Sequence, residues 1–352
     1  MATDKELCDG YGKNHTNADG TYFNPWSREA KNLGFNFKST SFKLVKFLAM
    51  RRVIDDSVPD LSQESLDEHF PVIPFDGESE ENSRAPDEGM RCTWFGHATC
   101  LVQFDNISVL TDPVFSDRCA PVQLPGLPKR LRKVPCYVEK LPKIDIVVIS
   151  HNHYDHLDLN TVKDLNKSQG SGVNWFVGLG LKKWFTDLGV ENVHELDWWD
   201  EHKLRDGVTV VFTPTQHWSK RTPFDTNKSL WGSWIVKGPR FKFMHLGDTG
   251  YCQTFKTIGD VHGPIDLAAV PIGAYHPRDF LKAQHVDPVE AVQIHQDIKA
   301  KKSVGIHWGT FELGREAFLG PRRELEAELQ KKNLSDKDFF TTVIGESVHL
   351  FL

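Results

Sequence analysis

Within the stretch SHNHYDHLD, six consecutive residues include four potential metal ligands. The apolar run at 146–149 predicts a buried strand, and His151 and His153 follow it two residues apart. Because residues i and i+2 at a strand end point the same way, these imidazoles can bind one metal ion. Asp155 and His156 can face a second ion if a helix begins there. A surface cluster of polar residues is the alternative, but zinc accepts these groups and one ion rarely needs four of them.

Three further apolar runs lead directly into side chains that can bind metal. VTVVFTP precedes Gln216 and His217, FKFMHL precedes Asp248, and SVGI precedes His307. A single His or Asp at a strand end is more often structural than functional. Together with the cluster, however, these residues supply the missing ligands of a two-metal centre in number and type.

The elements that must position these side chains follow a regular order beyond the first ninety residues. Apolar, β-rich runs such as IDIVVIS, VNWFVGL and LAAVPIG recur there. Helical stretches lie between several of them, at 159–167, 181–188, 288–299 and 322–332. Strands first, then strands alternating with helices, predict a layered α/β protein with mixed sheets.

Two segments of different character precede this region. Positions 41–52 predict a short basic amphipathic helix, which either packs on the main domain or touches an anionic membrane surface. Positions 55–88 are acidic and contain four prolines, which is typical of a surface linker. We place the domain boundary near Met90, between an N-terminal extension, 1–90, and a catalytic domain, 91–352.

Composition limits the classes of function and location. The 352 residues are 39% hydrophobic, enough for a sizeable core, and the net charge of −6 argues against a surface built for nucleic acid. The chain begins without the apolar core of a secretory signal, and no run approaches the roughly 18 apolar residues of a membrane span. Its six cysteines form no C-x-x-C pair, which fits a reducing compartment. We expect an intracellular protein with peripheral membrane contact.

The order of the ligands resembles a family pattern. His-x-His-x-Asp-His, followed by a His, an Asp and a His at strand ends, resembles the metallo-β-lactamase superfamily. Asp112 looks like the Asp of its first motif, which supports the site without binding metal. From about Arg91 to the end of the chain, stretches are similar to the N-acylphosphatidylethanolamine-hydrolysing phospholipase D family: GHATCLVQ, ISHNHYDHLD, LWGSWIVKGP, GDTGYC, PIGAY, QHVDPVEAV and IHWGTF.

The resemblance implies a four-layer αβ/βα sandwich, with two facing sheets, helices outside and two zinc ions at one edge. Seven side chains are implied as ligands: His151, His153 and His217 for one ion, Asp155, His156 and His307 for the other, and Asp248 as a bridge. These residue types alone do not distinguish zinc from iron or manganese.

The implied reaction is hydrolysis of N-acylphosphatidylethanolamine to N-acylethanolamine and phosphatidic acid. A hydroxide bridging the metals would attack phosphorus, with Asp248 orienting it. Gln284 and His285 precede a predicted helix start and can reach the site from a loop. His285 would assist the phosphate or the leaving group; the alternative is a packing role.

Further residues are expected around the ligands. Asp112 and Asp158 are candidates to hydrogen-bond the outer ring nitrogens of ligand histidines. The other histidines, including His97 and His245, receive no metal role.

A basic and apolar loop at 121–135 predicts the surface for the lipid chains. Its lipid-contacting residues are expected to be Lys129, Arg130, Leu131 and Arg132, which suit an anionic interface. An ordinary solvated basic loop is the alternative. The expected partner is phospholipid at a membrane surface, with no nucleic acid, and we also consider a homodimer.

Two other functions compete with this interpretation. The same ligands serve a hydrolase of another small substrate, such as a lactone or another phosphodiester. A metal-holding scaffold or lipid-binding module without turnover is a rival of a different class. Turnover of bis-p-nitrophenyl phosphate by the zinc-loaded protein would separate enzyme from scaffold.

Overall fold

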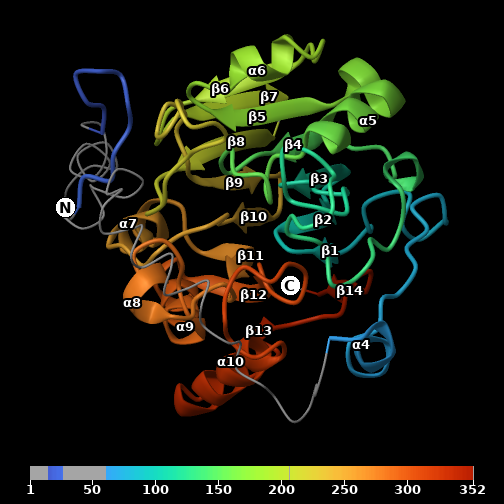
Figure 1. The fold of residues 1–352 in the computed structure, drawn as a ribbon. Coiled ribbons are helices and arrows are strands. Elements are labelled where there is room, and N and C mark those ends of the chain that lie inside the picture. Colours follow the sequence, from blue (N-terminus) through green and yellow to red (C-terminus); the bar gives the residue numbers. More distant parts are fainter. Residues whose placement is uncertain (1–14, 27–60, 206, 352) are drawn as a thin grey trace.

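Two seven-stranded sheets pack face to face in the computed structural model, which describes residues 15–26, 61–205 and 207–351 (Figure 1). The first sheet has the order β14-β1-β2-β3-β4-β5-β6. Its strands are β1 (Met90–Gly96), β2 (Thr99–Phe104), β3 (Ile107–Thr111), β4 (Ile146–Val148), β5 (Asn174–Gly178), β6 (Val193–Leu196) and β14 (Ser347–Leu350). Neighbours from β14 to β3 are antiparallel, whereas those from β3 to β6 are parallel.

The second sheet repeats this mixture of pairings in the order β13-β12-β11-β10-β9-β8-β7. Its strands are β7 (Glu201–Arg205), β8 (Val208–Thr213), β9 (Ser233–Lys237), β10 (Lys242–His245), β11 (Ile265–Pro271), β12 (Ala300–Ile306) and β13 (Phe339–Phe340). Neighbours from β7 to β10 are antiparallel, and those from β10 to β13 are parallel. The predicted mixed sheets are confirmed.

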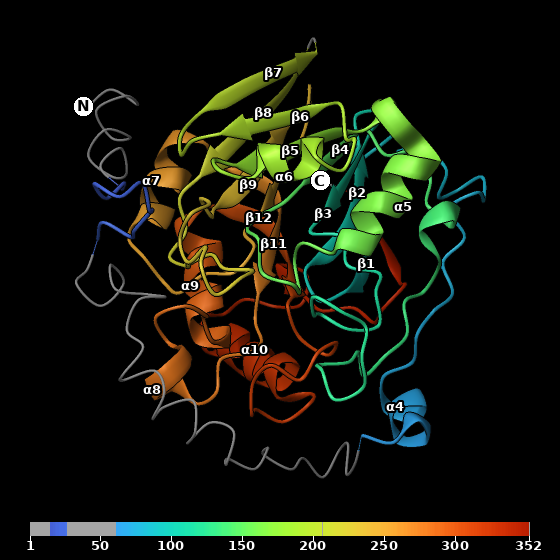
Figure 2. The ribbon, with the colours of Figure 1, turned by 45° about the horizontal axis from the view of Figure 1, so that its top comes forward.

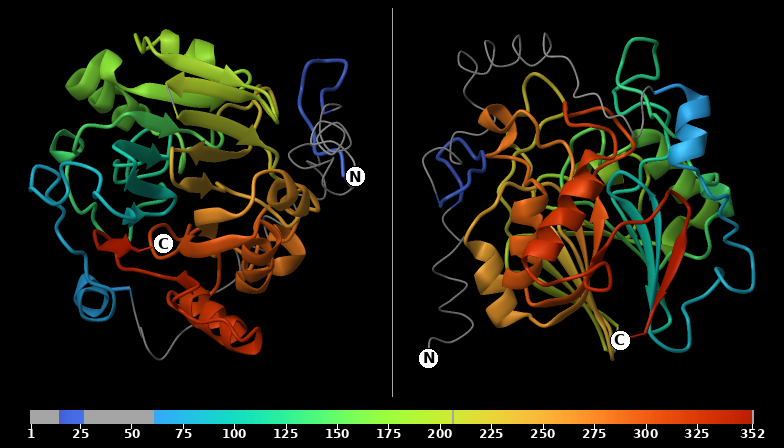
Figure 3. Two further views of the ribbon diagram at one scale, coloured as in Figure 1. Left: turned by 180° about the vertical axis from the view of Figure 1, so that it is seen from behind. Right: turned by 90° about the horizontal axis from the view of Figure 1, so that it is seen from below.

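Helices cover the outer faces of both sheets, α5 on the first and α7, α9 and α10 on the second (Figures 2 and 3). The helices are α4 (Gln63–His69), α5 (Leu159–Gln169), α6 (Lys182–Thr186), α7 (Thr254–Val261), α8 (Arg278–Leu281), α9 (Pro288–Asp297) and α10 (Gly320–Lys331), with short 3-10 turns at Val138–Lys140 and Gly170–Gly172. The four predicted helical stretches coincide with α5, α6, α9 and α10, and the predicted four-layer sandwich is confirmed. Within the described residues, no helix combines the length and apolar composition required to span a bilayer.

Alternating side chains of the first sheet fill two different cores. Ile146 and Val148 of β4 lie in the core shared by the two sheets. Val147 and the adjoining Ile149 point the other way, into the core beneath α5. A strand buried on both faces requires an unbroken apolar run, which explains why the sequence before the ligand cluster has no polar alternation.

The strands that precede the predicted ligands end at one edge of the sandwich. In the second sheet β10 and β12 run in the same direction, and β8 shares it because two antiparallel pairings separate β8 from β10. Their carboxyl ends therefore reach the same edge. The carboxyl ends of β3 and β4, which are parallel in the first sheet, face them there.

Residues 61–90 run along the surface of the sandwich, largely exposed, and are anchored to it at a few points. Leu66 and Phe70 are fully buried in the main core, and Phe75 is buried in the core beneath α5. A few widely spaced apolar anchors hold an otherwise acidic segment, and its average composition does not reveal them. The basic helix predicted at 41–52 lies outside the described residues.

Candidate metal centre

The seven predicted ligands meet at the edge where these strands end. They come from the segments that follow β4, β8, β10 and β12. Five of them are almost inaccessible to solvent, with exposures of 3% or less: His151, His156, His217, Asp248 and His307. Burial of so many polar groups is costly unless each finds a partner, which points to a shared partner at this place.

His151, His153 and His217 form the first group. His151 Nε2 lies 2.8 Å from His153 Nδ1, and His217 Nε2 lies 3.2 Å from the same atom. Their ligand atoms all lie within 4.8 Å of one another. This is the set of side chains that the resemblance assigns to one metal ion.

Asp248 joins the first group to a second. Its Oδ2 lies 3.7 Å from His217 Nε2 and 3.2 Å from His156 Nε2, while its Oδ1 lies 2.9 Å from His307 Nε2. Asp155 completes the second group, since its Oδ2 lies 3.5 Å from His307 Nε2. A carboxylate between two sets of histidines has the placement expected of a bridging ligand.

The donor set fits metal cations. The Nε2 atoms of His156 and His307 and Oδ1 of Asp248 are buried at this place and, close as they lie to one another, make no well-aligned hydrogen bond in the described part of the chain. Unpaired ring nitrogens and carboxylate oxygens that converge on one place are what divalent metal binding requires. The sequence therefore predicted a group of residues that the fold does bring together.

Asp112 supports the ligands from behind, as predicted. Its Oδ2 accepts hydrogen bonds from His156 Nδ1 and His245 Nε2, both at 2.8 Å, and its Oδ1 accepts one from the backbone N–H of Ser150 at 2.7 Å. A partner on the outer nitrogen fixes the tautomer, so that the Nε2 of His156 faces the site.

Asp158 has a different role, and its prediction as a partner of a ligand histidine is wrong. Its carboxylate accepts hydrogen bonds from the backbone N–H of Asn160, from Ser116 and from Thr161. Asp158 is thus the N-cap of α5, where the first backbone N–H groups need acceptors. Among the described contacts of Asp158, none reaches a ligand histidine.

Gln284 and His285 reach the site from the loop between α8 and α9. The carbonyl oxygen of Gln284 accepts the hydrogen bond of His217 Nδ1 at 3.0 Å, and its side-chain Oε1 accepts one from Trp218 Nε1 at 2.7 Å. His285 Nδ1 is 3.8 Å from Asp248 Oδ2 and has no hydrogen-bond partner among the described residues. Burial lowers the pKa of His285 to about 4, so its ring is neutral at pH 7.

Two of the four residues that were predicted to contact lipid are buried in the protein. Arg130 is buried and donates to the carbonyl oxygens of Ser116 and Val114, whereas the buried Arg132 pairs with Asp67. The guanidinium group of Arg130 donates to backbone carbonyl oxygens inside the protein and that of Arg132 pairs with the exposed carboxylate of Asp67, so both buried arginines are engaged within the protein. Leu131 packs against the main core, which leaves Lys129 as the exposed member of the predicted set.

Two histidines with no predicted metal role belong to this centre. His245, the last residue of β10, is fully buried and donates to Asp112. His97, in the turn between β1 and β2, donates from Nε2 to Asp155 Oδ2 at 2.8 Å. One signal was available for His97, because it follows the apolar run CTWFG as the predicted ligands follow theirs.

A cavity of about 560 Å³ opens onto the ligands. Its wall mixes aromatic, apolar and cationic side chains, including Tyr154, Trp218, Lys220, Arg221 and Leu313. Arg221 also donates to the carbonyl oxygens of Asn152 and Leu157, and thus ties the ligand loop to the cavity wall. Such a cavity suits a substrate with a charged group at the metals and apolar parts beyond them.

Burial and the neighbouring carboxylates act in opposite directions on the pKa of two histidines in this centre. Burial by itself lowers the pKa of His307, but the carboxylates of Asp248 and Asp155 raise it to about 9. His156 has a raised pKa for the same reason, despite its burial. The metal-free centre therefore holds protons at pH 7 where metal cations are expected.

Metal uptake should consequently displace protons. Because His307 and His156 bind metal only after losing their protons, we expect the apparent zinc affinity to rise by at least about tenfold per pH unit from about pH 6 towards pH 9. Calorimetric titration in buffers of different ionisation enthalpy measures the protons released. His285→Ala should leave this slope unchanged, since His285 is already neutral. An affinity independent of pH would contradict the expectation.

Comparison with known proteins places this geometry in a class. Residues 108–308 match the family model described as the Beta-lactamase superfamily domain. The fold is shared by the isothiocyanate hydrolase of Delia radicum gut bacteria, with a TM-score of 0.57 and 18% identity, over 74% of this chain and 99% of that one. Fold and site thus define a hydrolase of the metallo-β-lactamase superfamily.

Relatives in sequence identify the family within this superfamily. The N-acyl-phosphatidylethanolamine-hydrolyzing phospholipase D 1 of Caenorhabditis elegans is 39% identical over 316 residues, which cover 87% of this chain and 86% of that protein. The mitochondrial N-acyl-phosphatidylethanolamine-hydrolyzing phospholipase D of Saccharomyces cerevisiae is 37% identical over 261 residues, covering 72% and 54%. This chain belongs to the N-acyl-phosphatidylethanolamine-hydrolyzing phospholipase D family of that superfamily, as the sequence motifs predicted.

Proposed function

We propose that this protein is a two-zinc phosphodiesterase that hydrolyses N-acylphosphatidylethanolamine to N-acylethanolamine and phosphatidic acid. The carrying observation is the convergence of all seven ligand side chains in a chain 39% identical to a relative named for this hydrolysis. His151, His153 and His217 would hold one ion, Asp155, His156 and His307 the other, and Asp248 both. When bound, the metals supply an activated water and polarise the phosphoryl oxygen.

Side chains around the metals complete the reaction. The ring of His285 lies 5.4 Å from that of His217 and 5.3 Å from that of His307, beside both groups. Its N–H can donate to a phosphoryl oxygen or to the oxygen of the leaving alcohol, which needs a proton or hydrogen bond as the bond to phosphorus breaks. Lys220, in the cavity wall, brings a positive charge towards the anionic phosphodiester.

The acyl chains need an apolar route from a membrane to this cavity. Leu124 and Phe224 are 61% and 83% exposed. Their two loops lie side by side, since Val122 of one and Thr222 of the other line the same hollow. Together with the exposed Lys129, these apolar side chains form a surface that suits contact with an anionic bilayer. The proposed location is intracellular, with the protein held peripherally on membranes.

Polar substitutions in this surface should separate membrane contact from chemistry. Burial of one such side chain in a bilayer contributes about 1.5–3 kcal/mol, so the Leu124→Ser and Phe224→Ser double variant, which removes two of them, should lose at least about 100-fold activity on anionic vesicles. Turnover of soluble bis-p-nitrophenyl phosphate should change less than about twofold.

Phe351→Ser is the matched control for this surface. Phe351 is 71% exposed, but it follows β14 where Leu350 pairs with Met90, at the end of β1 away from the metal centre. It should leave vesicle activity unchanged. Equal losses on vesicles and on the soluble substrate in the double variant would refute the membrane surface.

Lipid mass spectrometry tests the substrate. The zinc-loaded protein, incubated with mixed membrane phospholipids, should consume N-acylphosphatidylethanolamine and produce N-acylethanolamine with phosphatidic acid. Nitrocefin and simple lactones should not turn over. The reverse outcome, lactone hydrolysis with every phospholipid intact, would favour the alternative of a hydrolase for another small substrate.

A further inference from the structure

His97 occupies a strained position in the turn between β1 and β2. Its backbone has φ of 53°, in the left-handed region that residues other than glycine seldom adopt, and its side chain is 1% exposed. Such a conformation costs on the order of 1 kcal/mol or more, and it persists only where the surroundings hold it firmly. An observed strained residue at a candidate site calls for a functional explanation.

Three hydrogen bonds hold the backbone of His97. Its N–H donates to Thr310 Oγ1 at 2.6 Å. Its carbonyl oxygen accepts from Trp94 Nε1 and from the backbone N–H of His307, each at 2.8 Å. His307 itself has a positive φ of 63°. The turn of the first sheet is thus fastened directly to the ligand loop of the second sheet.

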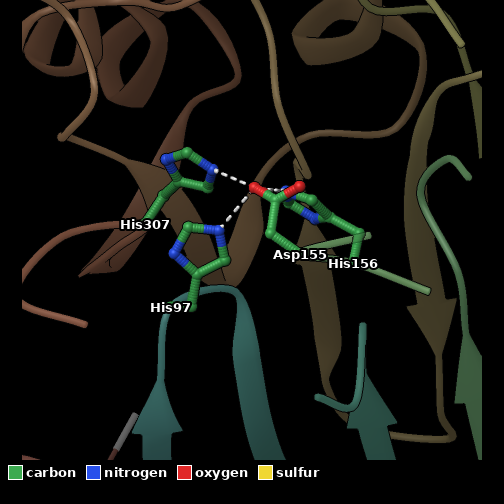
Figure 4. A group of neighbouring side chains, drawn as sticks. All are labelled: His97, Asp155, His156 and His307. Atoms are coloured by element: carbon green, nitrogen blue, oxygen red, sulfur yellow. Dashed lines mark hydrogen bonds and ion pairs between the residues drawn. The ribbon is translucent and has the colours of Figure 1, made fainter. Parts of the chain in front are cut away.

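The side chain of His97 makes a second connection, to another ligand. Its Nε2 donates to Asp155 Oδ2 at 2.8 Å, and its ring lies 4.0 Å from that of His307 (Figure 4). Asp155 lies in the loop after β4, and its side chain is 15% exposed towards the cavity. Without a firm partner, a carboxylate in such a loop would have rotational freedom.

We propose that His97 is a positioning residue for the second metal group. Its imidazole orients the carboxylate of Asp155, and its carbonyl oxygen sets the position of His307. One residue thereby fixes the relative placement of two ligands that come from different sheets. This inference rests on the proposed metal centre but not on the lipid substrate, because metal binding can be measured with no substrate present.

Metal content and the spectrum of the cobalt(II)-substituted protein test the proposal. In His97→Ala, the second metal should bind about 10–100-fold more weakly, the usual effect of removing an outer-shell partner, and the first should be retained. The absorption of cobalt at the second group should change. For bis-p-nitrophenyl phosphate, kcat should fall with little change in KM.

Rescue distinguishes a hydrogen bond from simple packing. The amide of His97→Gln can donate from a place near that of Nε2, so this variant should recover most of the second-metal affinity, whereas the shorter His97→Asn should not. Thr310→Val, which removes the support of the His97 N–H without touching a ligand, should give a smaller loss of the same kind. It also keeps the test available if His97→Ala does not fold.

His295→Ala is the control for loss of a buried histidine. His295 is 5% exposed and contacts Ser303 Oγ at 2.8 Å, outside the metal centre. It should retain both metals. Full second-metal affinity in His97→Ala, or equal losses in the Gln and Ala variants, would overturn the proposal.

Discussion

Asp248→Ala should reduce phosphodiester hydrolysis by at least about 10³-fold, more than the 10–100-fold that loss of an outer-shell residue causes. Asp248 places Oδ1 2.9 Å from His307 Nε2 in the second group and Oδ2 3.7 Å from His217 Nε2 in the first, so its removal leaves both groups without their common carboxylate. Elemental analysis of the purified variant should find fewer than two zinc ions per chain. Retention of both ions would remove Asp248 from the bridge.

Asp266→Ala controls for the loss of a buried carboxylate from the same sheet. Asp266 is 6% exposed in β11 and pairs with Lys301 at 2.7 Å, away from the ligands. This variant should lose stability but keep its two metals and its activity per folded molecule. The comparison separates an effect on the metal centre from a general effect on folding.

Asp112→Ala should have the largest effect on stability. Its fully buried carboxylate accepts hydrogen bonds from Ser150, His156 and His245, and its removal leaves these donors unpaired inside the protein. Breaking a buried charged pair in this way costs about 3–5 kcal/mol, measured as the free energy of unfolding in urea for the metal-free protein. Zinc affinity should also fall about 10–100-fold, since His156 loses its partner.

The difference in the free energy of unfolding between the wild type and Asp112→Ala should depend on pH. Burial alone would raise the pKa of Asp112, but His245 and His156 hold it far below its usual range. A carboxyl with a depressed pKa contributes stability above its unfolded pKa of about 3.9, and this is lost as the pH falls through the folded value. The wild type should therefore exceed the variant from about pH 5 upward, with a shrinking margin on acidification. A constant margin would contradict this origin.

The ligands could be predicted from sequence because each obeys a local rule. A strand buried on both faces appears as an apolar run, and a side chain directly after it lies at the sheet edge, as for His151 after β4 and His307 after β12. Parallel strands then bring such ends together. The alternation of helices and strands likewise predicted a layered α/β protein with mixed sheets, whereas the four-layer sandwich was implied by the family resemblance.

Residues whose role depends on a distant partner could not be predicted in this way. Asp158 caps the helix that follows it, which is a local role, but only the fold shows that it also accepts hydrogen bonds from Ser116, 42 positions away. Arg130 and Arg132 appear as a solvated basic cluster in sequence, yet buried carbonyl oxygens and Asp67 engage them. His97 contacts a ligand 58 positions along the chain. Such pairings are properties of packing, which local pattern does not contain.

The fold alone does not determine which substrate this protein hydrolyses. The structure shared with the isothiocyanate hydrolase at 18% identity shows the architecture and leaves the chemistry of the substrate open. For this chain the substrate proposal rests on sequence relatives and on the cavity, where Lys220 and Leu313 lie in the same wall as the ligands. An oxygen isotope in the water can show directly which bond of the substrate is broken.

Hydrolysis of N-acylphosphatidylethanolamine in water enriched with oxygen-18 tests the central claim most directly. If water attacks phosphorus at the paired metal centre, mass spectrometry should find one labelled oxygen in the phosphatidic acid and none in the N-acylethanolamine. The label should appear with the zinc-loaded wild type and be nearly absent with Asp248→Ala. Label in the N-acylethanolamine, or an intact lipid after incubation with the zinc-loaded wild type, would contradict the account.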